Sequence, residues 1–260
     1  MPRIKILILA TVAILAVVSV ATAAPIPLSA TGTAKTITIS SHPEAIGYSG
    51  VSGTGGRFVG SIVSGGLTYA DVYFWCVDME NSVSVPTTYN GNVIALNNWN
   101  STTRNYVEKA NVTGPGWNWG GSTMSGLQRY QAAAYLLDMA LAGGGMNTEY
   151  QGAIWSLLDI KAMSPDLGLV DTASSTDAYS LRQLAANFVT NAANSTYDYN
   201  KWAVVSGIAD GSGNLNCDPN VQTFMVQLSN GGGQIPEPST YAMMGAGLLG
   251  LAFLSRRTKA

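Results

Sequence analysis

Two cysteines and one histidine are the side chains of this 260-residue sequence best suited to nucleophilic chemistry. They are Cys76, Cys217 and His42, the last within a Ser-His-Pro stretch. A thiol beside an imidazole could work as a nucleophile with its base, which would make the protein a cysteine hydrolase. No family-specific signature surrounds Cys76, so we expect His42 to be a surface-loop residue instead. Two distant cysteines and one histidine also do not make a zinc site, and we expect no metal or other cofactor.

Two short patterns contain a cysteine and a glutamine. Cys76 lies in Tyr-Phe-Trp-Cys-Val-Asp (73–78), an apolar segment typical of a strand, and Gln151 lies in Tyr-Gln-Gly-Ala-Ile-Trp (150–155), at the start of an expected helix. Together they resemble the thioester domains of bacterial surface adhesins, in which an aromatic-Cys-aliphatic strand and a Gln-x-aliphatic-aliphatic-Trp helix bring the two side chains together. The resemblance covers about residues 45–230 in the order of elements, and it implies a thioester between Cys76 and Gln151.

Such a bond would form when the cysteine sulfur attacks the glutamine side-chain carbonyl and ammonia leaves. An amide is a poor electrophile in water, so the fold would have to hold both groups together. We expect N–H groups at the helix start to stabilise the thiolate and the developing oxyanion. Trp75, Tyr150 and Trp155 would then shield the bond from hydrolysis.

Structural roles compete with this chemistry. Thr-Glu-Tyr-Gln (148–151) matches a capping box, in which Gln151 returns a hydrogen bond to the helix start. Cys76 could be a buried apolar residue, or half of a disulfide with Cys217. Trp117-Asn118-Trp119, in a glycine-rich stretch, is a candidate platform for carbohydrate, although aromatic side chains more often belong to a core.

The elements that would position these residues follow from the apolar periodicity. Period-two alternation between Gly, Ser and Asn turns predicts strands, and period-3.6 patterns that begin after Ser125 or at Thr148 predict helices. We expect an α+β fold, a mostly antiparallel β body with an inserted helical block. The predicted strands are 35–39, 46–64, 67–77, 82–89, 201–207 and 221–228, and the predicted helices are 125–142, 148–162 and 176–193.

The N-terminus has the three parts of a secretory signal peptide. Arg3 and Lys5 precede an apolar run at 6–20, and Ala21-Thr22-Ala23 forms a small-residue cleavage site. We therefore expect residues 1–23 to be removed on export. The mature chain would begin near Ala24.

The C-terminus combines three ordered features within residues 234–260. Pro236-Glu237-Pro238 comes first, an apolar run from Tyr241 to Leu254 follows, and Arg256 and Arg257 lie close to the chain end. This order resembles the PEP-CTERM signal, which an exosortase of Gram-negative bacteria recognises and cleaves. The resemblance implies that exosortase is a partner and that the apolar run is a membrane helix until processing.

The segment between the termini, 24–233, is predicted to be the globular thioester-like domain. It has eight basic and 14 acidic residues, a formal net charge of −6. This acidic body offers no cationic footprint, so we expect no binding to nucleic acid or anionic lipid.

We expect a cell-surface or matrix protein that captures an amine-bearing protein or glycan covalently, for adhesion, without turnover. The alternative is a structural biofilm or envelope protein with no reactive bond, stapled by a Cys76–Cys217 disulfide.

Overall fold

Alternating apolar residues build a closed ring of strands. A computed structural model describes residues 25–47, 54–79, 81–107, 118–119, 122–158, 177–208 and 216–229. The main sheet has the order β1-β9-β4-β3-β2-β5-β8, and β8 also pairs with β9, which closes it. Its pairs are antiparallel except β1 with β9. The strands are β1 (Ile26–Pro27), β2 (Gly32–Gly47), β3 (Thr54–Ser64), β4 (Leu67–Cys76), β5 (Thr87–Ala95), β8 (Trp202–Gly207) and β9 (Phe224–Ser229).

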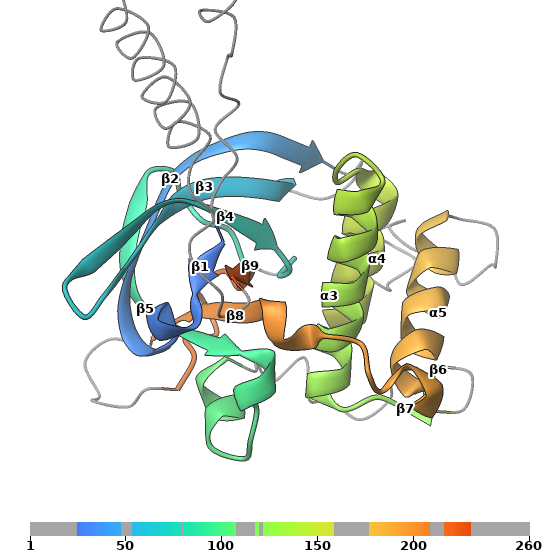
Figure 1. Cartoon of the computed structure of the whole chain (residues 1–260). Coiled ribbons are helices and arrows are strands. Elements are labelled where there is room, and N and C mark those ends of the chain that lie inside the picture. The colour runs from blue at the N-terminus through green and yellow to red at the C-terminus, as the bar shows by residue number, and fades with distance from the viewer. Residues whose placement is uncertain are drawn as a thin grey trace, which may run out of the picture. The chain divides into compact units, whose positions relative to one another are not determined.

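The helical block lies between the strands in sequence, as expected. It comprises α3 (Gly126–Ala142), α4 (Thr148–Leu158) and α5 (Asp177–Thr190), preceded by the short strands β6 (Asn118–Trp119) and β7 (Ser122–Thr123). Figure 1 shows the three helices grouped beside the ring of strands. Ser125 caps α3 with a complete capping box, its side chain accepting from Gln128 N–H while Gln128 returns the bond. The α+β class predicted from the sequence therefore describes this part of the chain.

Successive residues of a strand point to opposite faces, so alternate residues of β4 belong to two different apolar clusters. Phe74 and Cys76 belong to a cluster with residues of β1, β2, β3, β5, β8 and β9, which is the interior of the ring. Trp75 and Val77 belong to the other cluster, together with α3, α4 and α5. The helices thus cover the outer face of β4 and its neighbours, whereas the Cys76 side chain points into the ring.

Several predicted boundaries are wrong. The strand expected over 46–64 combines the end of β2 with β3, two antiparallel strands paired from Thr36 opposite Val63 to Gly47 opposite Thr54. The strand expected over 82–89 begins only at Thr87, after the cis Val85–Pro86 bond, and runs to Ala95. Proline lacks an N–H for the ladder, which explains the late start. His42, expected in a loop, lies in β2.

The two ends of the chain lie outside the described residues. These are the predicted signal peptide at 1–23 and the predicted membrane helix at 241–254. Among the helices of the described ranges, none has the length and apolar character needed to cross a membrane.

Candidate functional site

The Gln151 side chain lies between the ends of β3 and β4, at Cys76. Its Nε2 donates a hydrogen bond of 2.9 Å to the Cys76 carbonyl, and its Oε1 accepts one of 2.8 Å from Gly56 N–H. Gln151 and Cys76 are both completely buried. The two residues that the sequence patterns singled out are therefore neighbours, 75 positions apart in the chain.

The carboxamide occupies a position in the strand ladder. Pairing of β3 with β4 ends at Arg57 opposite Trp75, so Gly56 and Cys76 would form the next pair. The Gln151 amide lies there instead. Its oxygen accepts from Gly56 N–H and its nitrogen donates to the Cys76 carbonyl, as a backbone peptide group would. A buried amide needs both partners, and these two bonds fix the plane of the group.

The capping-box interpretation of Gln151 is wrong. The first turn of α4 is capped by Asn147, whose Oδ1 accepts from Tyr150 N–H at 3.0 Å. Gln151 N–H bonds to the Asn147 carbonyl at 3.0 Å. The Gln151 side chain is therefore released from the helix start and reaches the strands.

Two glycines of β3 make room for this contact. A Cβ on Gly55 would lie 2.6 Å from both Gln151 Cδ and Trp155 Cζ2. Gly56 has φ +99°, and a Cβ there would meet the Glu44 carbonyl oxygen at 1.9 Å. Gly55 thus sets how closely the helix residues approach, and Gly56 turns its N–H toward Gln151.

The Cys76 sulfur is surrounded by hydrogen-bonding groups. Gln222 Nε2 lies 2.8 Å from Sγ, and the thiol donates to the Asp78 carbonyl at 3.3 Å. The Trp155 side chain lies close to the sulfur. Trp155 lies one helical turn after Gln151, so one face of α4 contacts both Cys76 and the β3 glycines.

Burial raises the pKa of the Cys76 thiol to about 12. Contacts with Trp155, the Asp78 backbone and Gln222 act in part against this increase in the pKa, while the Asp78 charge adds to it. The thiol is consequently a weak free nucleophile at neutral pH, because reactive cysteines need a lowered pKa. Any reaction here must depend on the proximity of its partner and on donors to the developing charges.

His42 has other partners than Cys76. Its Nε2 is 2.8 Å from the Gly55 carbonyl oxygen, and its Nδ1 is 3.4 Å from Thr54 Oγ1. Its ring stacks on Phe58 with a centroid distance of 3.6 Å. These contacts hold the start of β3 against β2, and they give no support to a cysteine hydrolase.

The structure does not join Cys76 to Cys217. Cys217 forms an isolated bridge with Ile208 and donates its N–H to the Asn105 carbonyl at 3.0 Å. Cys76 instead pairs with Phe224 of β9. The disulfide alternative is therefore absent from this arrangement.

The expected shielding and donors need correction. Trp155 shields the site, but Trp75 and Tyr150 pack in or against the helix-side cluster. The donor to the carboxamide oxygen is Gly56 N–H of a strand and not an N–H of the helix start. Of the proposed sugar platform, Asn118 and Trp119 form β6, and Trp117 lies outside the described residues.

Gly55, Gly56 and Gln222 belong to the site but were missed in the sequence. Thr54-Gly55-Gly56 resembles the sequence of many turns in this glycine-rich chain. The sequence around Gln222 contains no motif that would indicate a functional residue. Within the described residues, no cluster of three or more His, Cys, Asp or Glu side chains could hold a metal ion.

Comparison with known families identifies the C-terminal segment. Residues 234–257 match the family model described as the PEP-CTERM protein-sorting motif. This motif marks an exported, envelope-associated protein that an exosortase processes. Neither the curated proteins nor the solved structures contain a match to the chain. The resemblance to thioester-domain adhesins gains no support from these comparisons and stays a hypothesis.

Proposed function

We propose that this exported protein forms an internal thioester between Cys76 and Gln151 and uses it to bond covalently to an amine on another surface. One observation carries the proposal, namely the Gln151 carboxamide held between Gly56 N–H and the Cys76 carbonyl. These two hydrogen bonds fix the oxygen and the nitrogen of the Gln151 amide. Its carbonyl carbon, Cδ, is therefore held in place next to Cys76. Because burial keeps the Cys76 thiol protonated, the reaction depends on the proximity of the two residues instead of on a preformed thiolate.

Formation of the bond balances without any further reactant. Cys76 Sγ attacks Gln151 Cδ, the C–N bond breaks, and the thiol proton leaves with the nitrogen as ammonia. Gly56 N–H, 2.8 Å from Oε1, is aimed at the oxygen where negative charge develops. The Cys76 carbonyl holds the nitrogen that departs.

Opening of the bond is the functional step. A primary amine attacks Gln151 Cδ, the C–S bond breaks, and the amine becomes an amide of Gln151 while Cys76 regains its proton. The bond is consumed once, so the protein does not turn over. Complete burial of both residues keeps bulk water away until a target amine displaces the covering groups.

The C-terminal motif supports an extracellular site of action. It marks an exported, envelope-associated protein, and in that location amine-bearing proteins and glycans of other surfaces would be within reach. We infer that processing leaves residues 24–233 at the cell surface or in the matrix, with the domain free to react.

Intact-mass analysis of the freshly secreted protein tests the proposal. We expect the mature chain to weigh one ammonia less than its sequence, and methylamine to add across the bond and expose one thiol. Cys76→Ala and Gln151→Ala should show the full sequence mass and no methylamine adduct. Gln222→Ala tests whether the acyl group belongs to the other buried glutamine near the sulfur. Gln227→Ala, on β9 opposite Trp202, is the control and should react as the wild type does.

Three outcomes would contradict the proposal. A wild-type protein of full mass would exclude a thioester. Loss of two hydrogens that a reductant reverses would indicate the Cys76–Cys217 disulfide of a structural protein. Loss of ammonia that persists in Gln151→Ala but disappears in Gln222→Ala would assign the acyl group to Gln222.

A further inference from the structure

Gln222 is the second buried glutamine at Cys76, and its backbone is held against the end of β4. Val77 N–H donates to the Thr223 carbonyl at 3.2 Å, and Thr223 N–H donates to Asp78 Oδ2 at 3.2 Å. These two bonds fix the segment just before β9. Gln222 is 3% exposed, so its side chain is buried beside the end of β4.

The Gln222 amide presents its nitrogen to the sulfur. Nε2 is 2.8 Å from Cys76 Sγ and 3.2 Å from the Asp78 carbonyl oxygen, so one nitrogen holds both. Gln151 differs in that its nitrogen is directed at the Cys76 carbonyl and its oxygen at Gly56 N–H. The two glutamines thus face different atoms of the same cysteine.

We propose that Gln222 is a catalytic residue of the thioester reaction, whose N–H groups stabilise the Cys76 sulfur when it leaves as a thiolate. This inference rests on the proposed function. When an amine attacks Gln151 Cδ, the electron pair of the breaking C–S bond goes to Sγ. The amine's proton later neutralises that thiolate.

The burial of Cys76 makes this donor necessary. A thiolate in an apolar interior is strongly disfavoured unless hydrogen bonds compensate for the lost water. Gln222 is the side chain that donates a hydrogen bond to the sulfur, and Trp155 lies close to it. Trp155 also belongs to the core of the ring, whereas Gln222 is a polar side chain whose burial this contact accounts for.

The test compares Gln222→Met with Gln227→Met in the full secreted protein. Methionine keeps the length and approximate volume of glutamine but has no N–H. Gln227 lies on β9 opposite Trp202, and the same substitution there controls for packing of this strand. We expect thioester-loaded Gln222→Met to react with methylamine on the order of tenfold or more slowly, as for loss of one donor to a developing charge. Gln227→Met should match the wild type.

A spectroscopic measurement separates this role from packing. Gln151→Ala retains the free thiol, so its infrared S–H stretching band reports the hydrogen bonds at the sulfur. Adding Gln222→Met should shift that band, whereas adding Gln227→Met should not.

The outcomes are distinguishable. A wild-type chain of full mass would overturn the proposed function and the leaving-group role with it. A wild-type thioester that opens equally fast in Gln222→Met, with an unshifted S–H band, would overturn this inference alone. If Gln222→Met never loads, the band shift together with an unchanged melting temperature supports the role, and an unshifted band rejects it.

Discussion

At Gly55 the absence of one methyl group decides how closely α4 approaches the strands. Only hydrogen fits there, because a Cβ would lie 2.6 Å from the Gln151 carboxamide carbon. Core atoms tolerate no such overlap, so either the glutamine or the strand would have to move. The residue therefore sets where the Gln151 carboxamide lies without contributing a side chain to the site.

We predict that Gly55→Ala abolishes or strongly reduces loss of ammonia and costs about 1–3 kcal/mol of unfolding free energy. The added methyl displaces the carboxamide from Gly56 N–H and also presses on Trp155. Intact mass reports the thioester, and urea denaturation reports the stability.

Gly47→Ala is the matched control on the same pair of strands. A Cβ on Gly47 would meet only Thr54 Cγ2, at 3.7 Å, which is ordinary contact. This variant should lose ammonia as the wild type does. If Gly55→Ala also loads fully, the close approach at Gly55 is not needed for the bond.

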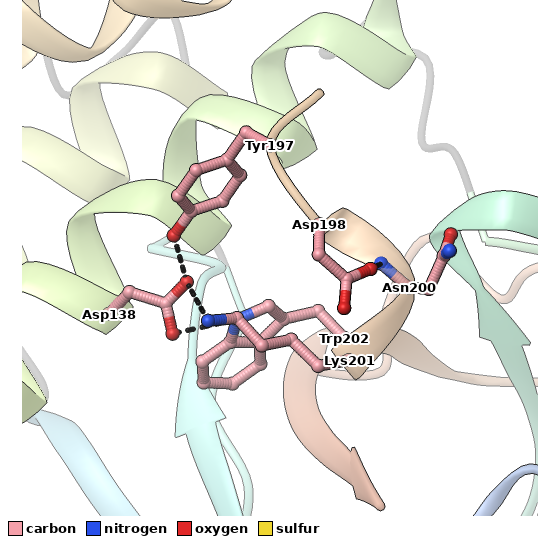
Figure 2. Close-up of polar contacts among 6 residues, drawn as sticks. All are labelled: Asp138, Tyr197, Asp198, Asn200, Lys201 and Trp202. Atoms are coloured by element: carbon pink, nitrogen blue, oxygen red, sulfur yellow. Dashed lines mark hydrogen bonds and ion pairs between the residues drawn. The ribbon is translucent and has the colours of Figure 1, made fainter. Parts of the chain in front are cut away.

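At the scale of elements, Asp138 joins α3 to the segment that leads into β8. Figure 2 shows its carboxylate accepting from Tyr197 and Trp202 and facing Lys201. Trp202 Nε1 is 3.2 Å from Oδ1, and Lys201 Nζ is 3.0 Å from Oδ2. Burial and the Asp138 carboxylate raise the pKa of Tyr197, which keeps its hydroxyl protonated as a donor. One side chain thus connects the helical block to the ring.

We predict that Asp138→Ala lowers the free energy of unfolding by about 2–4 kcal/mol, because it leaves the buried Trp202 indole and the Tyr197 hydroxyl without their acceptor. Urea denaturation measures the loss. Asp198→Ala is the control, since Asp198 caps the neighbouring turn by accepting from Asn200 N–H at 2.9 Å, as Figure 2 also shows. Loss of such an exposed cap costs about 1 kcal/mol or less. If both variants lose the same free energy of unfolding, the Asp138 contacts contribute no more to stability than an exposed cap.

Periodicity predicted the helices better than the strands. The pattern that starts after Ser125 and stops at the glycines gave α3 to within one residue, because a helix is decided by local spacing and caps. The end of β2 and the start of β3 were missed because residues 46–64 were interpreted as one continuous strand. Pairing partners are non-local, so the alternation of apolar residues alone does not say which residues pair.

The site was predictable only in part for the same reason. The sequence contained Cys76 and Gln151 as separate patterns, and only the family resemblance linked them. Gly55, Gly56 and Gln222 entered the site through the β3–β4 and β4–β9 pairings, which bring distant residues together. Glycine and glutamine carry no chemical signature that would select them before those pairings are known.

At the scale of the whole molecule, the two ends of the folded domain belong to neighbouring strands. Ile26 of β1 lies opposite Leu228 of β9 in a parallel pair. The first strand after the expected cleavage site therefore cannot pair until the last strand has been made and exported. The strands that close the ring and the C-terminal motif at 234–257 consist of separate residues.

That separation leads to a prediction about Arg256 and Arg257. Replacing both with glutamine should leave the domain folded and able to lose ammonia, because the pair lies beyond Ser229, the last residue of β9. Processing should fail, because the arginines follow the apolar run and, by the positive-inside rule, fix its depth in the membrane. Peptide mapping of the surface and medium fractions should recover peptides from Tyr241 to Lys259 only in the double variant. Arg104→Gln, which changes an exposed arginine of the domain, should be processed normally. If the double variant is trimmed and released like the wild type, the arginine pair is not part of the sorting signal.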